Sequence, residues 1–568
     1  MSLPSPEVVR HPADYSPFLN ILQNKDVPES TAQRQHLRDI IKKSTEEDIP
    51  AIDEEIQELL ARIRELELTK KGILLNVSKF QEILTPNPIH RLPTEILLEI
   101  FFIHRDTTEG YITTISNGVW PLSHVSREWR SITLSLPKLW SNIAISAIES
   151  PAKNQLQLLN TALNRSGSHP LYVVAHFSWS TGFDDDDGLF STYGYPQTRN
   201  DTSNLGIPSW PSERQLSEAM IKSVVGHSNR WKTADISVLD PSLLRPIYGQ
   251  LSSLEKLTFA GDLDDFPQIL SIAPKLRDIE FHNSDSSSLQ LPWTQIFRFR
   301  ESQWNPSMDL LPRYLRILRQ NTQFEDFGVE YESIRSGNTP QLLTHTKLKA
   351  FMCTDIRLIR CLTLPNLQSL HLKAPFMRMC PSDMIPASSD LLSRSRCASN
   401  MRVLRLEGVV LNRDVLSLLE STASLTELNF TFDKWVISND TFLKVFIQRL
   451  STHGKSRKDM ARILLPKLES LTIDIEAINS HEWFACNIQF IDDSFVEMVE
   501  ARWKKSGNGI SQLRVVKFEG YTPATLSAFT VSGVTRMKKM RDEGLETYIA
   551  TMDINSTDDD RKEKTYIR

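Results

Sequence analysis

The stretch Leu367-Gln368-Ser369-Leu370-His371-Leu372 decides the fold of this chain of 568 residues. Its second half alternates apolar and polar residues, as a β-strand with one buried face does. Several copies of the stretch are introduced by Pro-x-Leu, as at Pro365. The same loosely apolar hexad starts at nine positions, which are Leu254, Leu276, Phe324, Leu348, Leu367, Met401, Leu425, Leu468 and Leu513. A weaker copy starts at Trp231, and residues 170–175 indicate an earlier strand.

Helical stretches lie between the hexads, as at 414–419 and 495–499. A strand and a helix that recur at roughly 20 to 45 residues are typical of a leucine-rich-repeat solenoid. In such a solenoid the strands form one curved parallel sheet and the helices pack on its convex side. Alternation within the hexad turns the leucines inward and side chains such as Lys256 and Thr258 toward the concave face.

The repeat is degenerate. It lacks the regular Asn that many solenoids stack after the strand, and its spacing is interrupted by insertions at 178–212, 374–400, 432–464 and 476–510. An irregular α/β domain whose strands only resemble repeats is the alternative, but nine hexads in order favour the solenoid. We therefore expect an α/β solenoid over 147–550.

A long helix is predicted over 45–86, ending at Thr85-Pro86-Asn87-Pro88. Apolar residues recur there at alternating three- and four-residue steps, a heptad seam interrupted only by Lys70. Two readings stay open: the helix folds back on its own domain, or it forms a parallel coiled-coil dimer with Lys70 as a register device. The seam consists of Ile49, Ile52, Ile56, Leu59, Ile63, Leu66, Ile73, Val77, Phe80 and Leu84.

Composition predicts the bounds of the two terminal segments. Residues 1–44 are rich in Pro, Ser, Gln and charged residues, which predicts a flexible segment. Residues 551–568 contain the charged run Asp558-Asp559-Asp560-Arg561-Lys562, which predicts a disordered tail.

A small helical module is predicted over 87–146. Pro93 fits the first turn of a helix, and from Ile96 to Ile103 only Glu99 is polar. A helix that is apolar on nearly all sides is deep core, or is half core and half docking surface. Two short helices cannot build a core alone, so they need the rest of this chain or another protein. The second helix places one apolar stripe, formed by Leu122, Val125, Trp129 and Ile132.

This module resembles an F-box, in the F-box-like variety common in mushroom-forming (basidiomycete) fungi. The resemblance implies a helical module that binds the Skp-type adaptor of cullin–RING ubiquitin ligases. Ser126 departs from it, because a Cys is frequent there, and the connection 106–120 is longer than usual. The residues that carry the resemblance are Leu92, Pro93, Glu95, Ile96, Leu97, Ile100, Phe101, Val125, Arg127, Trp129, Leu139 and Trp140.

Two groups of side chains are distinguished within the module. For Leu97, Phe101 and Trp140, a place in the internal core is as good an assignment as a contact with the adaptor. The expected adaptor-binding residues are Leu92, Pro93, Ile96, Ile100, Val125 and Trp129.

Bulk properties exclude several classes of protein. Apolar residues make up 40% and charged residues 24% of the chain, as in ordinary soluble proteins. A net charge of −5 argues against nucleic-acid binding by bulk electrostatics. The apolar runs are too short for a membrane helix and the amino terminus lacks signal-peptide features, so we expect a cytoplasmic or nuclear protein. Five cysteines without a Cys-x-x-Cys pair fit reduced thiols.

Catalytic, cofactor and metal motifs are not recognisable in the sequence. Nucleotide-binding glycine loops, nucleophile elbows and zinc-protease helices are missing, so we expect neither an enzyme nor a cofactor. The run Asp184–Asp187 lacks the pattern of a calcium loop, and His481, Cys486 and Asp492 match no standard ligand spacing. The aromatic insertion at 178–212 is either a binding loop or a poorly ordered segment.

The sequence favours a substrate-recognition subunit of a Skp–cullin–F-box ubiquitin ligase, with the solenoid reading an unknown protein target. A second hypothesis is a non-catalytic scaffold in which the F-box-like helices only cap the first repeat. A third is an enzyme whose site is unrecognised, which would need a pocket that gathers titratable side chains.

Overall fold

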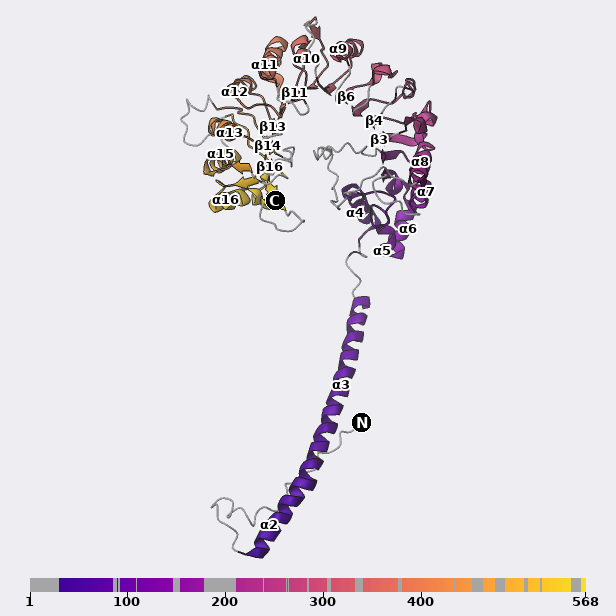
Figure 1. Cartoon of the computed structure of the whole chain (residues 1–568), viewed down its shortest axis with the longest axis vertical. Helices are drawn as coiled ribbons and strands as arrows, with labels where there is room; N and C mark the ends of the chain where they lie inside the picture. Colours follow the sequence, from indigo (N-terminus) through magenta and orange to yellow (C-terminus); the bar gives the residue numbers. More distant parts are fainter. Residues whose placement is uncertain are drawn as a thin grey trace. The chain divides into compact units, whose positions relative to one another are not determined.

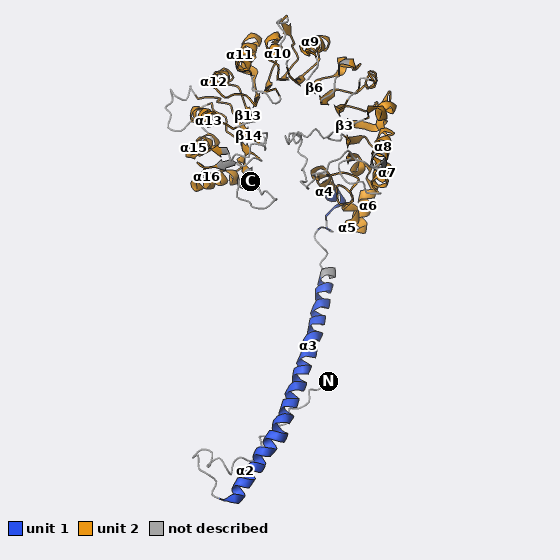
Figure 2. Cartoon of the chain, in the orientation of Figure 1, with its two compact units in different colours: residues 1–97 blue, residues 98–568 orange. Residues whose placement is uncertain are grey.

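The chain divides into two compact units, residues 1–97 and 98–568, and the division falls within helix α4 (Thr94–Thr107) (Figure 2). Each unit is described by itself. The computed structural model describes residues 30–84, 89, 92–108, 110–146, 154–177, 211–238, 240–261, 263, 265–282, 286–303, 308–332, 341–375, 381–432, 435–451, 463–475, 486–504, 509–520, 524–552 and 563–567.

The first unit contains α2 (Thr31–Lys43), a π-helical turn (Ser44–Asp48) and α3 (Ile49–Leu84). Helix α2 differs from the expected flexible segment, because Ser30 and Gln33 form a capping box that supplies partners for its first backbone amides. Helix α3 matches the predicted long helix, and its seam residues from Ile49 to Phe80 are exposed.

The second unit is built on one long sheet. Within the described residues, fifteen strands form this sheet, and every neighbouring pair from β1 to β18 is parallel. The strands line the inner side of an arc and the helices its outer side (Figure 1). The strands are, in spatial order, β1 (Asn142–Ser146), β2 (Leu171–Phe177), β3 (Trp231–Val238), β4 (Lys256–Ala260), β5 (Asp278–His282), β6 (Arg298–Gln303), β7 (Asp326–Tyr331), β9 (Ala350–Cys353), β11 (Ser369–Lys373), β12 (Val403–Glu407), β13 (Glu427–Thr431), β14 (Ser470–Asp474), β16 (Val515–Glu519), β18 (Glu546–Met552) and β19 (Glu563–Ile567).

Short strand pairs and outer helices complete the repeats. The small pairs are β8 (Leu343–Thr344) with β10 (Leu362–Thr363), and β15 (Cys486–Ile488) with β17 (Ala524–Leu526). The outer helices are α7 (Gln155–Arg165), α8 (Pro211–Val225), α9 (Leu311–Gln320), α10 (Ile356–Cys361), α11 (Met384–Ser395), α12 (Arg413–Ser421), α13 (Ile437–Leu450), α15 (Asp493–Trp503) and α16 (Val531–Asp542). None of the helices in the described part of the chain is long and apolar enough to span a bilayer.

The predicted repeat solenoid is confirmed, and each of the nine hexads coincides with a strand of the long sheet. Burial alternates along the strands, and inward leucines of neighbouring strands stand in register, as Leu370, Leu404 and Leu428 do. Such in-register rows bury apolar side chains continuously from repeat to repeat, which is what stabilises a solenoid.

Strand β6 was not recognised in the sequence, because its inward row contains a charge. The carboxylate of Glu301 takes the place of a leucine, is fully buried, and accepts hydrogen bonds from Arg313 of α9 and from Ser286. Burial raises the pKa of Glu301, and Arg313 opposes that rise. The neighbouring inward position of β6 is apolar, with Phe299 stacked on Phe327 of β7 at 5.7 Å between ring centroids.

The carboxyl-terminal end differs from the expected disordered tail. Strand β19 pairs antiparallel with β18, and Ile567 is buried. The charged run at 558–562 dominated the prediction, and it lies outside the described residues. The overlooked strand signal was the run Thr565-Tyr566-Ile567, three residues of types that are enriched in strands. Strand β19 covers the edge of β18, which would otherwise offer unpaired backbone groups to another chain.

Deleting residues 553–568 tests this role of β19. We expect a lower melting temperature and concentration-dependent self-association, because the truncated chain exposes the edge of β18 and loses the burial of Ile567. Ile567→Ala is the matched variant, and it should lower the melting temperature without promoting self-association. Thermal melts and light scattering read both effects, and a truncated chain that melts and stays dispersed like the parent would contradict this role.

Candidate partner-binding site

The inner face of α4 belongs to the core of the F-box-like module. Leu97 and Phe101 are buried, and the Phe101 ring lies 4.7 Å from the Trp129 ring, tilted by 57°. The assignment of these two residues to the core therefore agrees with their burial. An aromatic pair of this geometry contributes about 1 kcal/mol beyond the area that it buries.

The outer face of α4 carries apolar side chains without cover from the described part of the chain. Ile96, Ile100 and Ile103 follow one another at four- and three-residue steps, so they lie along one side of the helix. We call them the outer isoleucine row. Their exposed fractions are 48%, 37% and 60%. Fully burying one such side chain against a partner gains about 1.5–3 kcal/mol, so the row can support binding.

The second helical segment is broken at Ser126. It forms α5 (Leu122–Val125) and α6 (Arg127–Ser135), and Ser126 between them is extended and caps α6 by accepting the Trp129 backbone N–H at 3.1 Å. The break shifts the helical phase, so the predicted single stripe divides. Leu122 and Trp129 point into the core, whereas Val125 is 59% exposed.

Trp129 therefore differs from the other residues expected to contact an adaptor. Its side chain is only 7% exposed, and its indole N–H is enclosed without a hydrogen-bond partner among the described residues. Pro93 is exposed and Leu92 is half-buried, directly before α4, where the Pro93 carbonyl accepts the N–H of Ile96 at 3.0 Å. Five of the six expected residues are thus at least partly exposed. Trp129 is buried and packs against Phe101 of α4.

The module is also fastened to the first repeat. Trp120 and Trp140 meet edge to face at 4.9 Å, and the guanidinium of Arg165, at the end of α7, lies over both rings at 5.1 and 4.5 Å. The backbone N–H of Ile112 donates to the carbonyl of Ala144 in β1, the edge strand of the sheet. These contacts cover the end of the solenoid, and sequence reasoning missed Trp120 and Arg165. The long connection that contains Trp120 was their only signal.

The concave face carries charged side chains that pair across strands. Lys373 of β11 lies 3.0 Å from a carboxylate oxygen of Glu330 in β7 and 2.9 Å from one of Glu407 in β12, while His371 contacts Glu407 at 2.9 Å. Burial alone would raise the pKa of Glu407, but the hydrogen bond from His371 and the charge of Lys373 bring it to about 2. These pairs give this part of the concave face a fixed pattern of charge.

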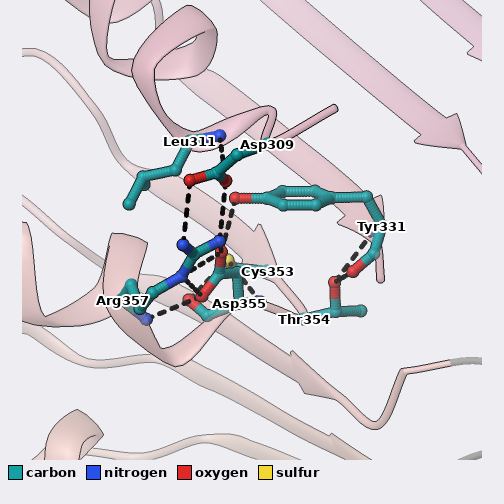
Figure 3. Close-up of polar contacts among 7 residues, drawn as sticks. All are labelled: Asp309, Leu311, Tyr331, Cys353, Thr354, Asp355 and Arg357. Carbon is teal, nitrogen blue, oxygen red and sulfur yellow. Dashed lines mark hydrogen bonds and ion pairs between the residues drawn. The ribbon is translucent and has the colours of Figure 1, made fainter. Parts of the chain in front are cut away.

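A buried polar cluster near α10 is the arrangement most like a catalytic site (Figure 3). The enclosed carboxylate of Asp355 accepts hydrogen bonds from the Tyr331 hydroxyl and the Arg357 guanidinium, both at 2.8 Å. Arg357 also binds Asp309, at 2.8 and 3.0 Å. Burial and the charge of Asp355 raise the pKa of the Cys353 thiol and of Tyr331 far above their ordinary values. A thiol so held is no nucleophile.

The cluster is therefore structural. Asp355 caps α10 by accepting the Arg357 backbone N–H, and Asp309 accepts the backbone N–H of Leu311 at the start of α9. Arg357 thus ties the starts of two outer helices to the sheet through two carboxylates.

Within the described residues, the remaining candidates for chemistry provide no site. The described residues contain no group of His, Cys, Asp and Glu that could hold a metal ion. Asp492 caps α15 by accepting the N–H of Phe495. Cys353, Cys361 and Cys397 are buried thiols. The run 184–187, the insertion at 178–210 and His481 lie outside the described residues.

Arg357→Ala tests the structural role of the cluster. Removing the cation leaves the carboxylate of Asp355 buried without its charge partner, which costs about 3–5 kcal/mol. The matched control is Arg360→Ala on the same helix, where an exposed pair with Asp383 contributes at most about 1 kcal/mol. Denaturant unfolding followed by circular dichroism measures both, and equal losses for the two variants would refute the assignment.

Comparisons with known proteins bear on the module and not on the solenoid. The family model described as F-box-like matches residues 89–146. No curated protein sequence matches the chain. Among solved structures, a Bacteroides fragilis protein aligns over 47% of this chain and 66% of its own, just under two thirds, at 11% identity with a TM-score of 0.26. A TM-score this low does not indicate a shared fold. The match to the family model coincides with the module built from α4, α5 and α6: residues 89–146 form an F-box-like domain.

Proposed function

We propose that this chain is the substrate-recognition subunit of a Skp–cullin–F-box type ubiquitin ligase. In this proposal the F-box-like domain binds a Skp-type adaptor, and through it a cullin–RING ligase, while the solenoid binds the protein target. The observation that carries the proposal is the outer isoleucine row, which leaves one side of α4 apolar and exposed while the other side is core. The family match over 89–146 supports the kind of partner.

The adaptor contact is proposed to use Pro93, Ile96, Ile100 and Val125, with Leu92 at the margin. Three of these residues are apolar side chains with large exposed fractions in a domain of few residues. Ile96 and Ile100 lie on one side of α4 and Val125 ends α5, and exposed apolar side chains that form a patch mark a protein-binding surface more often than single ones do. Trp129 contributes by holding Phe101, and therefore α4, in position.

The chain itself performs no chemical step in this scheme. It holds a target near the ligase's charged ubiquitin carrier and so raises the effective concentration of the reacting groups. The concave face, with its fixed charge pairs, is proposed to select the target. This role requires neither cofactor, nucleic acid nor membrane, and it places the chain in the cytoplasm or the nucleus.

The second candidate function is a scaffold in which the F-box-like helices only cap the solenoid. The contacts of Arg165 with Trp120 and Trp140, and of Ile112 with β1, favour a capping role. Capping explains the buried face of the module. It gives no reason for three exposed isoleucines on the opposite face of α4, so we favour the adaptor-binding proposal.

We also propose that the chain forms a homodimer through α3. Its heptad seam from Ile49 to Phe80 is exposed in the single chain, and such a seam is normally buried against a partner helix.

Ile100→Glu tests the adaptor-binding proposal. A charge in the middle of the outer isoleucine row should weaken adaptor binding at least about 30-fold, because a carboxylate would be buried without a partner. The melting temperature should stay within about 2 °C of the parent, since Ile100 already faces solvent. A pull-down with a purified Skp-type adaptor, followed by titration calorimetry, measures the loss.

Ile272→Glu is the matched control, because Ile272 is an isoleucine of the solenoid that is 50% exposed, against 37% for Ile100. It should leave adaptor binding unchanged. Replacing Leu92 and Pro93 by Ala should also abolish recovery of the adaptor. If the parent chain fails to bind, or if Ile100→Glu and Leu92→Ala/Pro93→Ala act only on the melting temperature, the capping scaffold is the better account.

A further inference from the structure

The seam of α3 has the composition of a two-stranded parallel coiled coil. Its a positions hold Ile49, Ile56, Ile63, Lys70 and Val77, and its d positions hold Ile52, Leu59, Leu66, Ile73 and Phe80. Branched residues at a with leucine at d favour two parallel strands, and the two central heptads follow that rule. A single lysine at an a position favours a two-stranded assembly with a fixed register, because each further strand would bury another ammonium group.

The seam begins at a defined place. The π-helical turn Ser44–Asp48 inserts an extra residue into the helical phase, so the heptads start at Ile49 and α2 does not continue them. From Ile49 to Phe80, the seam residues of α3 are exposed over a length of roughly 50 Å. None of the described residues of α2 is buried either. Both helices are thus exposed, but only in α3 do the exposed apolar residues follow the heptad register.

The charged residues beside the seam are placed as expected for pairing with a parallel α3 of a second copy. Arg62 stands at a g position and Glu67 at the following e position, which are the two positions that meet between neighbouring strands of a parallel pair. A parallel dimer therefore makes this contact twice. Among the described residues of one chain, Arg62 pairs with exposed Glu65 alone, a weak contact that a second chain can replace.

We infer that α3 pairs with α3 of a second copy as a parallel, in-register, two-stranded coiled coil, which makes the molecule a bivalent receptor. This inference deepens the homodimer of the proposed function, and its bivalence rests on that function. Parallel pairing brings the carboxyl-terminal ends of both α3 helices together. The chain from Leu84 to Thr94 spans about 35 Å at full extension. Both α4 helices then start within about 80 Å of each other.

Bivalence has a physical consequence for target binding. Once one solenoid of the pair holds a target, the second solenoid meets a neighbouring site on that target at a high effective concentration. A target with two recognition segments, or a dimeric target, would be held far longer than one with a single segment. The class of substrate that fits such a receptor is therefore a multivalent or oligomeric protein.

The orientation and stoichiometry are tested on the full chain. Light scattering after size exclusion should give twice the chain mass of 65.0 kDa. Leu59→Cys, at a d position away from the middle of the seam, should form a disulfide-linked dimer under mild oxidation. The matched control Ala61→Cys lies on the outer side of α3 and should not. A monomer, a trimer, or equal cross-linking of both variants would overturn the inference.

Two further variants separate this inference from the proposed function. Replacing Leu59 and Leu66 together by Glu should give a monomer that still binds the Skp-type adaptor, whereas Ile100→Glu should stay dimeric. Lys70→Ile should lower the dimer dissociation constant at least about tenfold, because two facing ammonium groups are removed. An unchanged dissociation constant for Lys70→Ile would show that Lys70 does not face its copy, and would refute the parallel register.

Discussion

A single helix packed against one layer of core can bury only one of its sides, and α4 is apolar on nearly all of its sides. Phe101 is fully buried on one side, against Trp129. The opposite side then has no place in the fold, and Ile103 is left 60% exposed there. A sequence that keeps isoleucines in water bears a cost that a polar residue would avoid. Binding to another protein is the physical reason that best accounts for this cost.

The contacts that cap the solenoid and the outer isoleucine row belong to two faces of one module. The contacts of Arg165 with Trp120 and Trp140 hold the module on the end of the sheet, and the backbone contact of Ile112 with Ala144 continues the edge strand. A module fixed in this way needs less ordering when it binds a partner, so capping would assist the proposed adaptor binding instead of competing with it.

Much of the solenoid could be predicted because its signal is periodic. Leu370 and its counterparts alternate with polar residues and recur from repeat to repeat, and each hexad became a strand. Strand β6 escaped because Glu301 stands in its inward row, and a buried carboxylate is only possible there because Arg313 pairs with it. Such a pair joins residues of two elements, so one-dimensional periodicity does not reveal it. Strand β19 was missed because the charged run at 558–562 outweighed the short strand-favouring run at 565–567.

The sequence could predict the type of candidate site, but less well which side chains form it. The apolar character of residues 96–103 predicted a helix that is either deep core or half core and half docking surface. It could not tell which face is which, because one polar residue, Glu99, does not define a polar face. The placement of Trp129 was missed for a different reason. The stripe from Leu122 to Ile132 assumed one continuous helix, but the extended backbone of Ser126 breaks it.

The most direct test is hydrogen–deuterium exchange on the full chain with and without a purified Skp-type adaptor. If the outer side of α4 is the binding surface, backbone amides of residues 94–107 and 122–135 should exchange more slowly in the complex. Those of the solenoid strands from β4 to β14 should be unchanged. Protection confined to the solenoid, or no protection at adaptor concentrations up to about 100 μM, would contradict the account.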